Sequence, residues 1–249
     1  MHRFMLKGKT ALVTGASRGI GRGIALNFAS HGAFVGINYL SNDEAANDTL
    51  QLVRKTGSDG ILLKGDVANS TDVDHIVNKL VESRGQIDIL VNNAGIYIRN
   101  KFEDISVKIW EKVISNNLTS GYLLCKKVIP YMKSNSKIIF ISSQLAFKGS
   151  LHGVDYATSK AGILGLMRSL ALELADKNIC VNAVAPGTID TDIIANYTKK
   201  MREERIKQIP LKRLGTNEDV ANCCIFLASS MSDYITGETI NVNGGLYIH

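Results

Sequence analysis

Short apolar runs alternate with longer amphipathic stretches along almost the entire chain. The runs are nearly continuous in hydrophobic residues, which is typical of strands that are covered on both faces. They predict strands at residues 10–14, 34–38, 61–64, 87–91, 137–142, 179–185 and 239–242. The intervening stretches predict helices at residues 21–30, 45–56, 71–83, 110–132, 156–175 and 217–228. Such alternation predicts an α/β fold with a doubly wound parallel sheet of about seven strands and helices on both faces.

The chain has 249 residues, a length that suits one large domain spanning residues 1–249. It contains no Pro/Gly/Ser-rich linker, low-complexity tract or internal repeat. The one long departure from the alternation is residues 188–210, which are polar, charged and helix-prone. Two interpretations remain open for this segment: a lid that closes over a substrate, or an ordinary pair of surface helices.

Composition excludes several classes of protein. No apolar run reaches the roughly 18 residues of a membrane span, and the first residues lack the apolar core of a secretory signal. We therefore expect a cytoplasmic protein without membrane contact. The net charge of +6 comes from scattered lysines and arginines, interleaved with acids in residues 199–205, which favours an anionic cofactor or partner over nucleic acid. The cysteines form no C-x-x-C pair and no histidine cluster accompanies them, so neither a metal nor a disulfide is expected.

A glycine-rich turn follows the first predicted strand and leads directly into a helix. Glycines let the backbone turn tightly and approach a pyrophosphate, and the helix N-terminus supplies free N–H groups and a favourable dipole. In this strand–turn–helix context the turn predicts a dinucleotide site, although its spacing is G-x-x-x-G-x-G rather than G-x-G-x-x-G. The residues expected to bind the cofactor here are Gly15, Ser17, Arg18, Gly19, Ile20 and Gly21.

The end of the second predicted strand distinguishes NAD(H) from NADP(H). A carboxylate there would bind the adenosine ribose hydroxyls and repel a 2′-phosphate. The chain instead has Asn38, Tyr39 and Leu40, and its first acid, Asp43, lies beyond the expected position. Arg18 in the glycine turn is placed to meet a 2′-phosphate. The sequence therefore favours NADP(H), with NAD(H) or dual use left open.

Further cofactor contacts are expected where other strands end, because open α/β sheets bind ligands at the carboxyl ends of their strands. Asp66 and Val67 follow the third strand and are placed to recognise adenine, although a helix-capping aspartate is an equally good interpretation of Asp66. After the sixth strand, Thr188 or Thr191 is placed to bond the nicotinamide carboxamide. The contacts expected after the fourth and sixth strands are Asn93, Ala94, Gly95, Pro186, Gly187, Ile189 and Thr191.

Tyr156 and Lys160 are the most informative pair for the chemistry. Residues i and i+4 of a helix meet on one face, so the Lys160 ammonium is expected to lower the pKa of the Tyr156 phenol toward the working range of an acid–base catalyst. Lys160 is also placed to reach the ribose hydroxyls of the cofactor. Ser143 ends the fifth predicted strand and is expected to donate a hydrogen bond to a substrate carbonyl while Tyr156 transfers the proton. The histidines show no partner pattern for a Ser-His-Asp triad, and no G-x-S-x-G elbow exists.

Taken in order, these motifs resemble the short-chain dehydrogenase/reductase family over essentially the whole length. The matching positions are Thr14, Gly15, Gly19, Gly21, 92–95, Asn117, Ser143, Tyr156, Lys160, 186–187 and 243–245. The resemblance implies a single Rossmann-type domain, hydride transfer at the nicotinamide and frequent homotetramers. It also implies a catalytic tetrad, in which Asn117 joins the three residues above and holds a water that relays protons to Lys160.

Within the family, residues 209–215 and 234–247 are most similar to 3-oxoacyl-(acyl carrier protein) reductases of fatty acid biosynthesis. This resemblance implies reduction of a 3-oxoacyl thioester to the 3-hydroxyacyl form, with the substrate carried on an acidic acyl carrier protein. Lys133, Lys137 and Lys177 stand where such reductases often place arginines at the active-site mouth.

Two other functions remain open. Bacterial glucose and polyol dehydrogenases share an Asn-Tyr-x-Ser stretch after the second strand, so an NAD(P)-dependent sugar or polyol dehydrogenase is the alternative. A nucleotide-sensing protein without catalysis is a third interpretation, and the intact tetrad argues against it.

Overall fold

The structure, a computed structural model, describes residues 5–191, 194 and 197–248. Seven parallel strands in these residues form one sheet in the order β3-β2-β1-β4-β5-β6-β7. The strands are β1 (Thr10–Val13), β2 (Phe34–Tyr39), β3 (Gly60–Lys64), β4 (Ile89–Asn92), β5 (Lys137–Ile141), β6 (Cys180–Pro186) and β7 (Thr239–Val242). The strand order reverses between β1 and β4, so the predicted doubly wound, Rossmann-type parallel sheet is confirmed.

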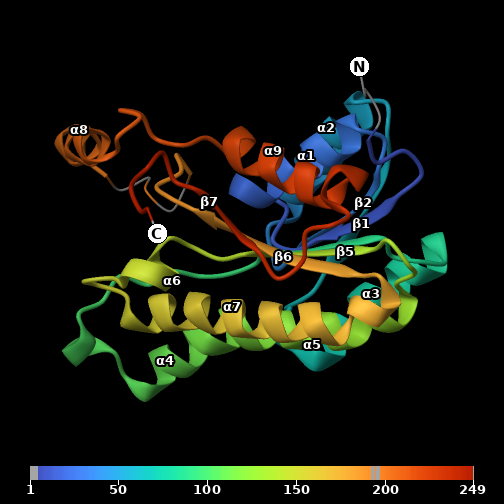
Figure 1. Cartoon of the computed structure of the whole chain (residues 1–249), viewed down its shortest axis with the longest axis horizontal. Helices are drawn as coiled ribbons and strands as arrows, with labels where there is room; N and C mark the ends of the chain where they lie inside the picture. The colour runs from blue at the N-terminus through green and yellow to red at the C-terminus, as the bar shows by residue number, and fades with distance from the viewer. Residues whose placement is uncertain (1–4, 192–193, 195–196, 249) are drawn as a thin grey trace.

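Two groups of helices cover the two faces of the sheet (Figure 1). On one face lie α1 (Gly19–Ser30), α2 (Asp43–Lys55) and α9 (Asn217–Ala228). On the other lie α3 (Ser70–Arg84), α4 (Val107–Ile114), α5 (Ser120–Val128) and α7 (Val154–Glu173). Several helix starts are specified locally, since Asn42, Asn69 and Thr216 each accept a hydrogen bond from a backbone N–H of the helix that follows.

The strands are buried by both groups of helices, which explains their nearly continuous hydrophobic sequences. Successive side chains of a strand point to opposite faces of the sheet. In β1, Ala11 and Val13 belong to the buried cluster that includes residues of α1 and α9. Leu12 belongs to the opposite cluster, with residues of α3, α5 and α7. The two clusters together fix the sheet between its helical layers.

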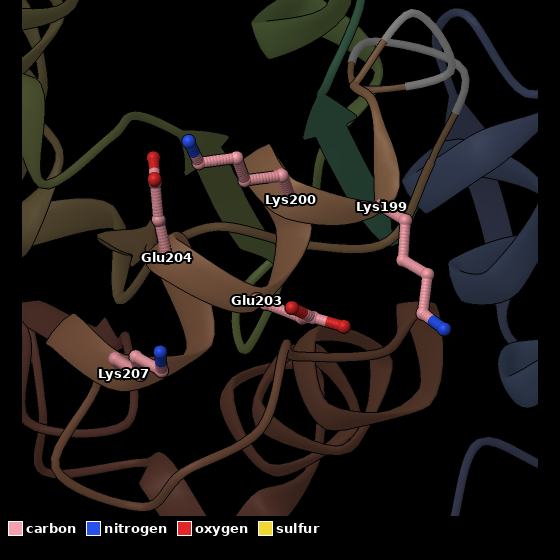
Figure 2. Close-up of a pocket in the computed structure, with 5 residues that line it drawn as sticks. All are labelled: Lys199, Lys200, Glu203, Glu204 and Lys207. Atoms are coloured by element: carbon pink, nitrogen blue, oxygen red, sulfur yellow. The ribbon is translucent and has the colours of Figure 1, made fainter.

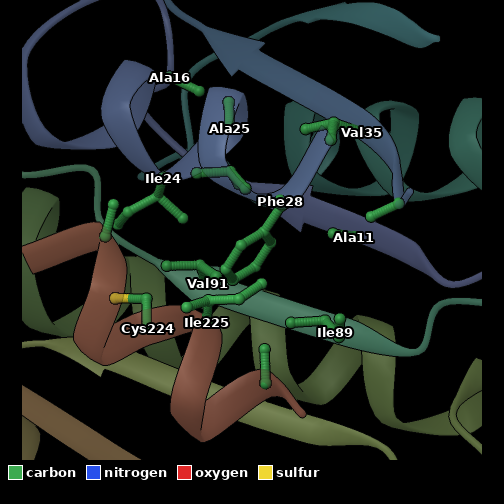
Figure 3. Close-up of a cluster of buried hydrophobic side chains, with 14 of the residues drawn as sticks. Ala11, Ala16, Ile24, Ala25, Phe28, Val35, Ile89, Val91, Cys224 and Ile225 are labelled. Atoms are coloured by element: carbon green, nitrogen blue, oxygen red, sulfur yellow. The ribbon is translucent and has the colours of Figure 1, made fainter. Parts of the chain in front are cut away.

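The packing of α1 positions the glycine turn that precedes it. Figure 3 shows Ile24 and Phe28 of α1 pointing toward Val91 of β4 and toward α9, and all three side chains are fully buried. α1 also approaches α9 closely, because a Cβ at Gly23 would lie only 2.8 Å from the Cβ of Asn217. The first turn of α1 is therefore held at a fixed place beside the carboxyl end of β1.

The single helix predicted over residues 110–132 is wrong in its continuity. The chain forms α4, a π-helical turn at Ser115–Thr119, α5 and a 3-10 turn at Ile129–Tyr131. Pro130 lies in the 3-10 turn directly after α5. Proline does not continue a regular helix, because it has no N–H to donate and its ring crowds the preceding turn. Asn117 lies in the π-helical turn, a feature that is frequent at functional sites.

Two short elements complete the part of the fold that surrounds the site. α6 (Leu145–Lys148) follows β5 and was not predicted, because four residues are too few to show a helical period. α8 (Lys199–Gln208) forms within the predicted lid, residues 188–210, of which 192–193 and 195–196 lie outside the described residues. In the described chain, no helix has both the length and the apolar character of a membrane span.

Candidate active site

The carboxyl ends of the central strands open into one cleft of about 890 Å³. The glycine turn after β1, the loops after β4 and β6, α6 and the start of α7 form its walls. Every position that the sequence predicts to bind the cofactor lines this cleft: Gly15, Ser17, Arg18, Gly19, Ile20, Gly21, Asp66, Val67, Asn93, Ala94, Gly95, Tyr156, Lys160, Pro186, Gly187, Ile189 and Thr191. The sheet order thus brings together segments that are far apart in the chain.

The glycine turn has the shape of a phosphate cradle. Gly15 and Gly19 have φ values of 61° and 56°, a left-handed conformation that glycine adopts without strain. A Cβ at Gly21 would lie 2.6 Å from Nδ2 of Asn93, so only glycine fits where the turn meets the loop after β4. The N-terminus of α1, directly behind the turn, has no side-chain cap. Its free N–H groups therefore suit an anionic ligand.

Asn38, at the end of β2, holds three strand ends together. Its Nδ2 donates hydrogen bonds to the carbonyl oxygens of Leu63 and Gly65, at 3.0 and 3.1 Å. Its Oδ1 accepts from the backbone N–H of Gly15 at 3.2 Å. The amide of Asn38 is therefore committed to the shape of the glycine turn and is not available to bind a ribose.

The first acid after β2 does not line the cleft. Asp43 accepts hydrogen bonds from Lys64 Nζ at 2.8 Å and from the Tyr39 hydroxyl at 2.7 Å. The Lys64 hydrogen bond, and then that of Tyr39, hold the pKa of this carboxyl below its usual range. Arg18 and Leu40 line this end of the cleft instead. In the described part of the chain, no carboxylate at the end of β2 lines the cleft, so none there would repel a 2′-phosphate.

Asp66 shapes the turn that follows β3. Its Oδ1 accepts from the backbone N–H of Ala68 at 2.9 Å, and the residue lines the cleft. The cap of α3 is Asn69, whose side chain accepts from the backbone N–H groups of Thr71 and Asp72. The capping interpretation of Asp66 is therefore wrong, because a neighbouring residue takes that role.

Ser143, Tyr156 and Lys160 meet in the cleft wall. Ser143 lies just beyond β5, near enough to Tyr156 in the first turn of α7 to lower the pKa of its phenol. One turn further along α7, the Nζ of Lys160 lies 5.6 Å from the centre of the Tyr156 ring. The same Nζ donates a hydrogen bond of 2.8 Å to the carbonyl oxygen of Ile141. The strand end and the helix start converge over one crevice, as the sequence predicts.

The expected lowering of the Tyr156 pKa by Lys160 is wrong for this structure. Burial raises the pKa of Tyr156 to about 12; the Ser143 hydrogen bond opposes this rise and Tyr97 adds to it. Burial also lowers the pKa of Lys160 to about 8. Both charged forms lose their hydration in the cleft wall, and the ammonium is bonded to the Ile141 carbonyl. Tyr156 is therefore held as a neutral phenol.

Asn117 lies behind the cleft wall and is not among its described lining residues. Its Oδ1 accepts from the backbone N–H of Ile96 at 2.8 Å, and its Nδ2 donates to the Ile96 carbonyl and to Oγ of Ser159, each at 3.0 Å. A Cβ at Gly95 would lie 3.0 Å from Asn117 Oδ1 and 3.5 Å from Lys160 Nζ. Asn117 thus ties the loop after β4 to α7, and a water held beside Lys160 stays a prediction.

Tyr97 is part of the site but was missed from the sequence. Its ring centroid lies 4.7 Å from that of Tyr156, and its hydroxyl donates a hydrogen bond of 2.9 Å to the carbonyl oxygen of His152. It links the loop after β4 to the loop before α7. No periodicity or motif marks this residue, because it lies in irregular structure.

Three cations of the cleft were also missed. Arg99, Lys148 and Arg205 line it from the loop after β4, from α6 and from α8. They come from separate segments with no shared spacing, so only the tertiary structure brings them together.

The lysines expected at the mouth of the active site lie elsewhere. Lys137 is the first residue of β5, is buried and bonds Asp233 at 2.7 Å. Lys133 and Lys177 are exposed and precede β5 and β6. All three lie toward the amino ends of strands whose carboxyl ends form the cleft. The prediction that these lysines lie at the mouth of the active site is therefore wrong for this chain. The direction of β5 and β6 places them at the edge of the sheet opposite the cleft.

A second hollow, of about 610 Å³, lies over α8 (Figure 2). Its lining residues are Lys199, Lys200, Glu203, Glu204 and Lys207. Figure 2 shows these side chains projecting from a single helix. Alternating charges of this kind are typical of a solvated helix face, and the hollow shares no residue with the cleft.

Known proteins resemble this chain in sequence and in fold over almost its whole length. A family model described as Enoyl-(acyl carrier protein) reductase matches residues 15–247. The chain is 43% identical over 247 residues to the 3-oxoacyl-(acyl carrier protein) reductase FabG of Chlamydia muridarum, an alignment that covers 97% of this chain and 98% of that protein. The chain belongs to the short-chain dehydrogenase/reductase family. It is accordingly an oxidoreductase that acts on CH–OH groups or the corresponding carbonyls.

Two solved members of the short-chain dehydrogenase/reductase family superpose closely. One, described as a glucose/ribitol dehydrogenase from Brucella melitensis, is 35% identical with a TM-score of 0.93 and covers 99% of this chain and 100% of its own. The other is a short chain dehydrogenase from Burkholderia cenocepacia in complex with NADP. It is 30% identical with a TM-score of 0.93, and the alignment covers 97% of this chain and 99% of the other. The family assignment thus supports a nicotinamide dinucleotide, NAD(P), as the cofactor.

Proposed function

We propose that the chain is an NADP(H)-dependent carbonyl reductase that converts a 3-oxoacyl thioester to its 3-hydroxyacyl form. The observation that carries the proposal is the convergence of Ser143, Tyr156 and Lys160 in the wall of the cleft, where the Lys160 Nζ lies 5.6 Å from the centre of the Tyr156 ring. A group that protonates a developing alkoxide must hold its proton at neutral pH. Burial of Tyr156 meets this requirement. The nicotinamide supplies the hydride when it is bound.

Each polar residue of the site has its own part in the reduction. Ser143 donates a hydrogen bond to the substrate carbonyl oxygen, and Tyr156 transfers its proton to that oxygen as negative charge develops. Lys160, with a pKa of about 8, is still largely an ammonium at neutral pH. It stabilises the phenolate that remains on Tyr156 and bonds the ribose hydroxyls. Asn117 positions the loop after β4 against α7 and supports a water that returns a proton toward Lys160.

The cleft suits an anionic dinucleotide. The cradle of Gly15 and Gly19 and the uncapped start of α1 fit the pyrophosphate. Arg18 beside Leu40, without a carboxylate from the end of β2, favours NADPH over NADH at the adenosine ribose. NAD(H) or dual use is the alternative, and a comparison of the two affinities decides between them.

The substrate assignment rests on similarity rather than on a contact. The relative from Chlamydia muridarum is named a 3-oxoacyl-(acyl carrier protein) reductase, which supports a thioester on an acyl carrier protein, in cytoplasmic fatty acid biosynthesis. The alternative is a sugar or polyol dehydrogenase, which the description of the Brucella melitensis protein favours.

We further propose one catalytic domain spanning residues 1–249, in which residues 188–210 act as a lid. Ile189 and Thr191 line the cleft at the start of this segment, and Ile194, Tyr197 and Arg205 line it further along. A segment that contributes to the wall at several points is well placed to enclose a substrate.

A homotetramer is the proposed assembly. Val107, Tyr122 and Leu172 are 72%, 47% and 82% exposed on α4, α5 and α7. These large apolar side chains project from one helical layer, and burial between copies of the chain would remove them from water.

An activity matrix on the purified protein tests the proposed function. Oxidation of NADPH and of NADH is followed with acetoacetyl-N-acetylcysteamine, and reduction of NADP⁺ and NAD⁺ is followed with glucose and ribitol. The proposal expects the fastest turnover with NADPH and the thioester. Rapid sugar oxidation with no thioester reduction would overturn it in favour of the dehydrogenase.

A further inference from the structure

Three cations line the cleft without an acidic partner in the described part of the chain. Arg99 lies in the loop after β4, Lys148 is the last residue of α6, and Arg205 lies in α8. None of them forms an ion pair with another described residue. Arg205 donates a hydrogen bond of 3.0 Å to the neutral amide of Gln208. In the described residues, no carboxylate therefore compensates these three positive charges of the cleft wall.

Lys148 and Arg205 are close enough to repel each other. Partial burial, and then the charge of Arg205, lower the pKa of the Lys148 ammonium. Like charges held together without a counter-ion destabilise one another, and a bound anion reverses this effect. A negative group bound between the two would therefore relieve their repulsion.

The charges on α8 are divided between its faces. Arg202 pairs with Asp190 at 2.8 Å. Glu203 and Glu204 line the outer hollow rather than the cleft (Figure 2). Arg205 is the residue of α8 that lines the cleft in the described chain. Among the described residues, no acid of this helix therefore neutralises the cleft-facing guanidinium.

Two of the three cations are more exposed than the groups that do the chemistry. Arg99 and Lys148 are exposed, whereas Ser143 and Lys160 are buried in the cleft wall. Arg18, proposed for the adenosine ribose, also lines the cleft. The exposed Lys148, with the half-buried Arg205 near it, is therefore placed to meet the outer part of a substrate whose carbonyl lies deeper.

We propose that Lys148 and Arg205 bind a phosphate group on the tail of the substrate. A guanidinium offers paired N–H donors that match phosphate oxygens, and an ammonium adds a compact charge. The inference rests on the proposed thioester substrate, since thioesters of coenzyme A and of carrier proteins share a phosphopantetheine arm. Lys148 and Arg205 then act as specificity residues, which strengthen binding without taking part in proton or hydride transfer.

Kinetics with charged and neutral thioesters test this assignment. Lys148→Gln and Arg205→Gln are compared with the parent on acetoacetyl-phosphopantetheine and on the uncharged acetoacetyl-N-acetylcysteamine. The matched control is Lys200→Gln, which removes a positive charge from the outer face of α8, the helix that carries Arg205 (Figure 2). Each cleft variant should raise KM for the phosphate-bearing substrate about 10-fold, with kcat and the neutral substrate unchanged. Equal losses on both substrates, or no loss on either, would overturn the proposal.

Acetoacetyl-coenzyme A identifies the phosphate that is bound. Equal losses with this compound and with acetoacetyl-phosphopantetheine support binding of the phosphate at the end of the pantetheine arm. A loss confined to the coenzyme A substrate, with none on acetoacetyl-phosphopantetheine, would contradict binding of the pantetheine phosphate and assign the two cations to the nucleotide part of coenzyme A.

Direct binding separates this inference from the proposed function. If the parent reduces no thioester, the proposed function fails, and titration of 4′-phosphopantetheine into protein saturated with NADP⁺ decides the inference. Binding that Lys148→Gln and Arg205→Gln each weaken supports a phosphate site. Absence of binding to the parent, or equal binding to parent and variants, contradicts it.

Discussion

The Nζ of Lys160 donates a hydrogen bond of 2.8 Å to the carbonyl oxygen of Ile141, the last residue of β5. This contact fixes the ammonium between the strand that precedes Ser143 and the helix that carries Tyr156. It also explains why the phenol keeps its proton, since the lysine charge is bonded to a backbone carbonyl and burial disfavours a phenolate. The structure thus keeps a protonated phenol close to the ammonium, as the proposed reduction requires.

The buried charge of Lys160 should be visible in the stability of the protein. Its pKa is lowered by burial from 10.5 to about 8, so between these values the unfolded state binds more protons and stability rises with pH. Lys160→Met removes this contribution. The parent should gain stability relative to the variant over that range, by at most about 1.4 kcal/mol per pH unit.

Urea unfolding of the parent and Lys160→Met at a series of pH values measures this difference. Lys200→Met, which replaces an exposed lysine, serves as the control and should follow the parent. A difference between Lys160→Met and the parent that does not change with pH would show that Lys160 titrates normally.

Arg18 should control the choice of cofactor. Arg18→Ala is expected to weaken NADPH binding about 10-fold, through loss of a charge-assisted contact to the 2′-phosphate. NADH affinity should change little. Fluorescence titration of both cofactors provides the measurement, and equal affinity of the parent for NADPH and NADH would contradict the assignment.

The neighbouring Arg22 offers a contrast to Arg18. Its Nε donates to the Thr49 hydroxyl at 2.8 Å, and its Nη2 donates to the carbonyl oxygens of Ser17 and Ala45 at 2.7 and 2.9 Å. Arg22→Ala should therefore lower the melting temperature and affect both cofactors alike. If Arg22→Ala selectively lost NADPH binding, Arg22 rather than Arg18 would be the residue that binds the 2′-phosphate.

Asn117 should act by positioning the site. In Asn117→Asp, a carboxylate oxygen replaces the Nδ2 that donates to the Ile96 carbonyl and to Ser159. Loss of these buried bonds should destabilise the fold by about 1–3 kcal/mol and lower kcat with little change in cofactor affinity. Asn116→Asp, which loses one exposed bond to the Lys112 carbonyl, is the matched control. Equal unfolding free energies for the two variants would rule out the bridging role.

The periodic parts of the fold could be predicted because their pattern is local. The strands and most helices follow from continuous apolar runs and amphipathic stretches, and the strand ends then converge by topology alone. This is why Gly15, Ser143, Tyr156 and Lys160 were placed at one site from the sequence. The break between α4 and α5 could not be predicted, since a π-helical turn does not alter the apolar pattern enough to be recognised.

Charge and protonation depend on the tertiary structure. The pKa of Tyr156 was predicted in the wrong direction, because helical spacing shows a lysine nearby but shows neither the burial of the phenol nor the carbonyl that binds the ammonium. Arg99, Lys148 and Arg205 were missed because they converge from three segments. The lysines at 133, 137 and 177 were placed at the mouth by analogy, and the direction of β5 and β6 puts them at the other edge.

The proton-donating role of Tyr156 is tested most directly by Tyr156→Phe. The substitution keeps the ring and removes the hydroxyl, so kcat for NADPH-dependent reduction of an acetoacetyl thioester should fall about 10³-fold, with NADPH binding largely retained. Tyr97→Phe is the control, since its ring contacts Tyr156 and its hydroxyl only bonds the His152 carbonyl. It should keep most of the activity. A Tyr156→Phe protein that reduces the thioester as fast as the parent would contradict the account.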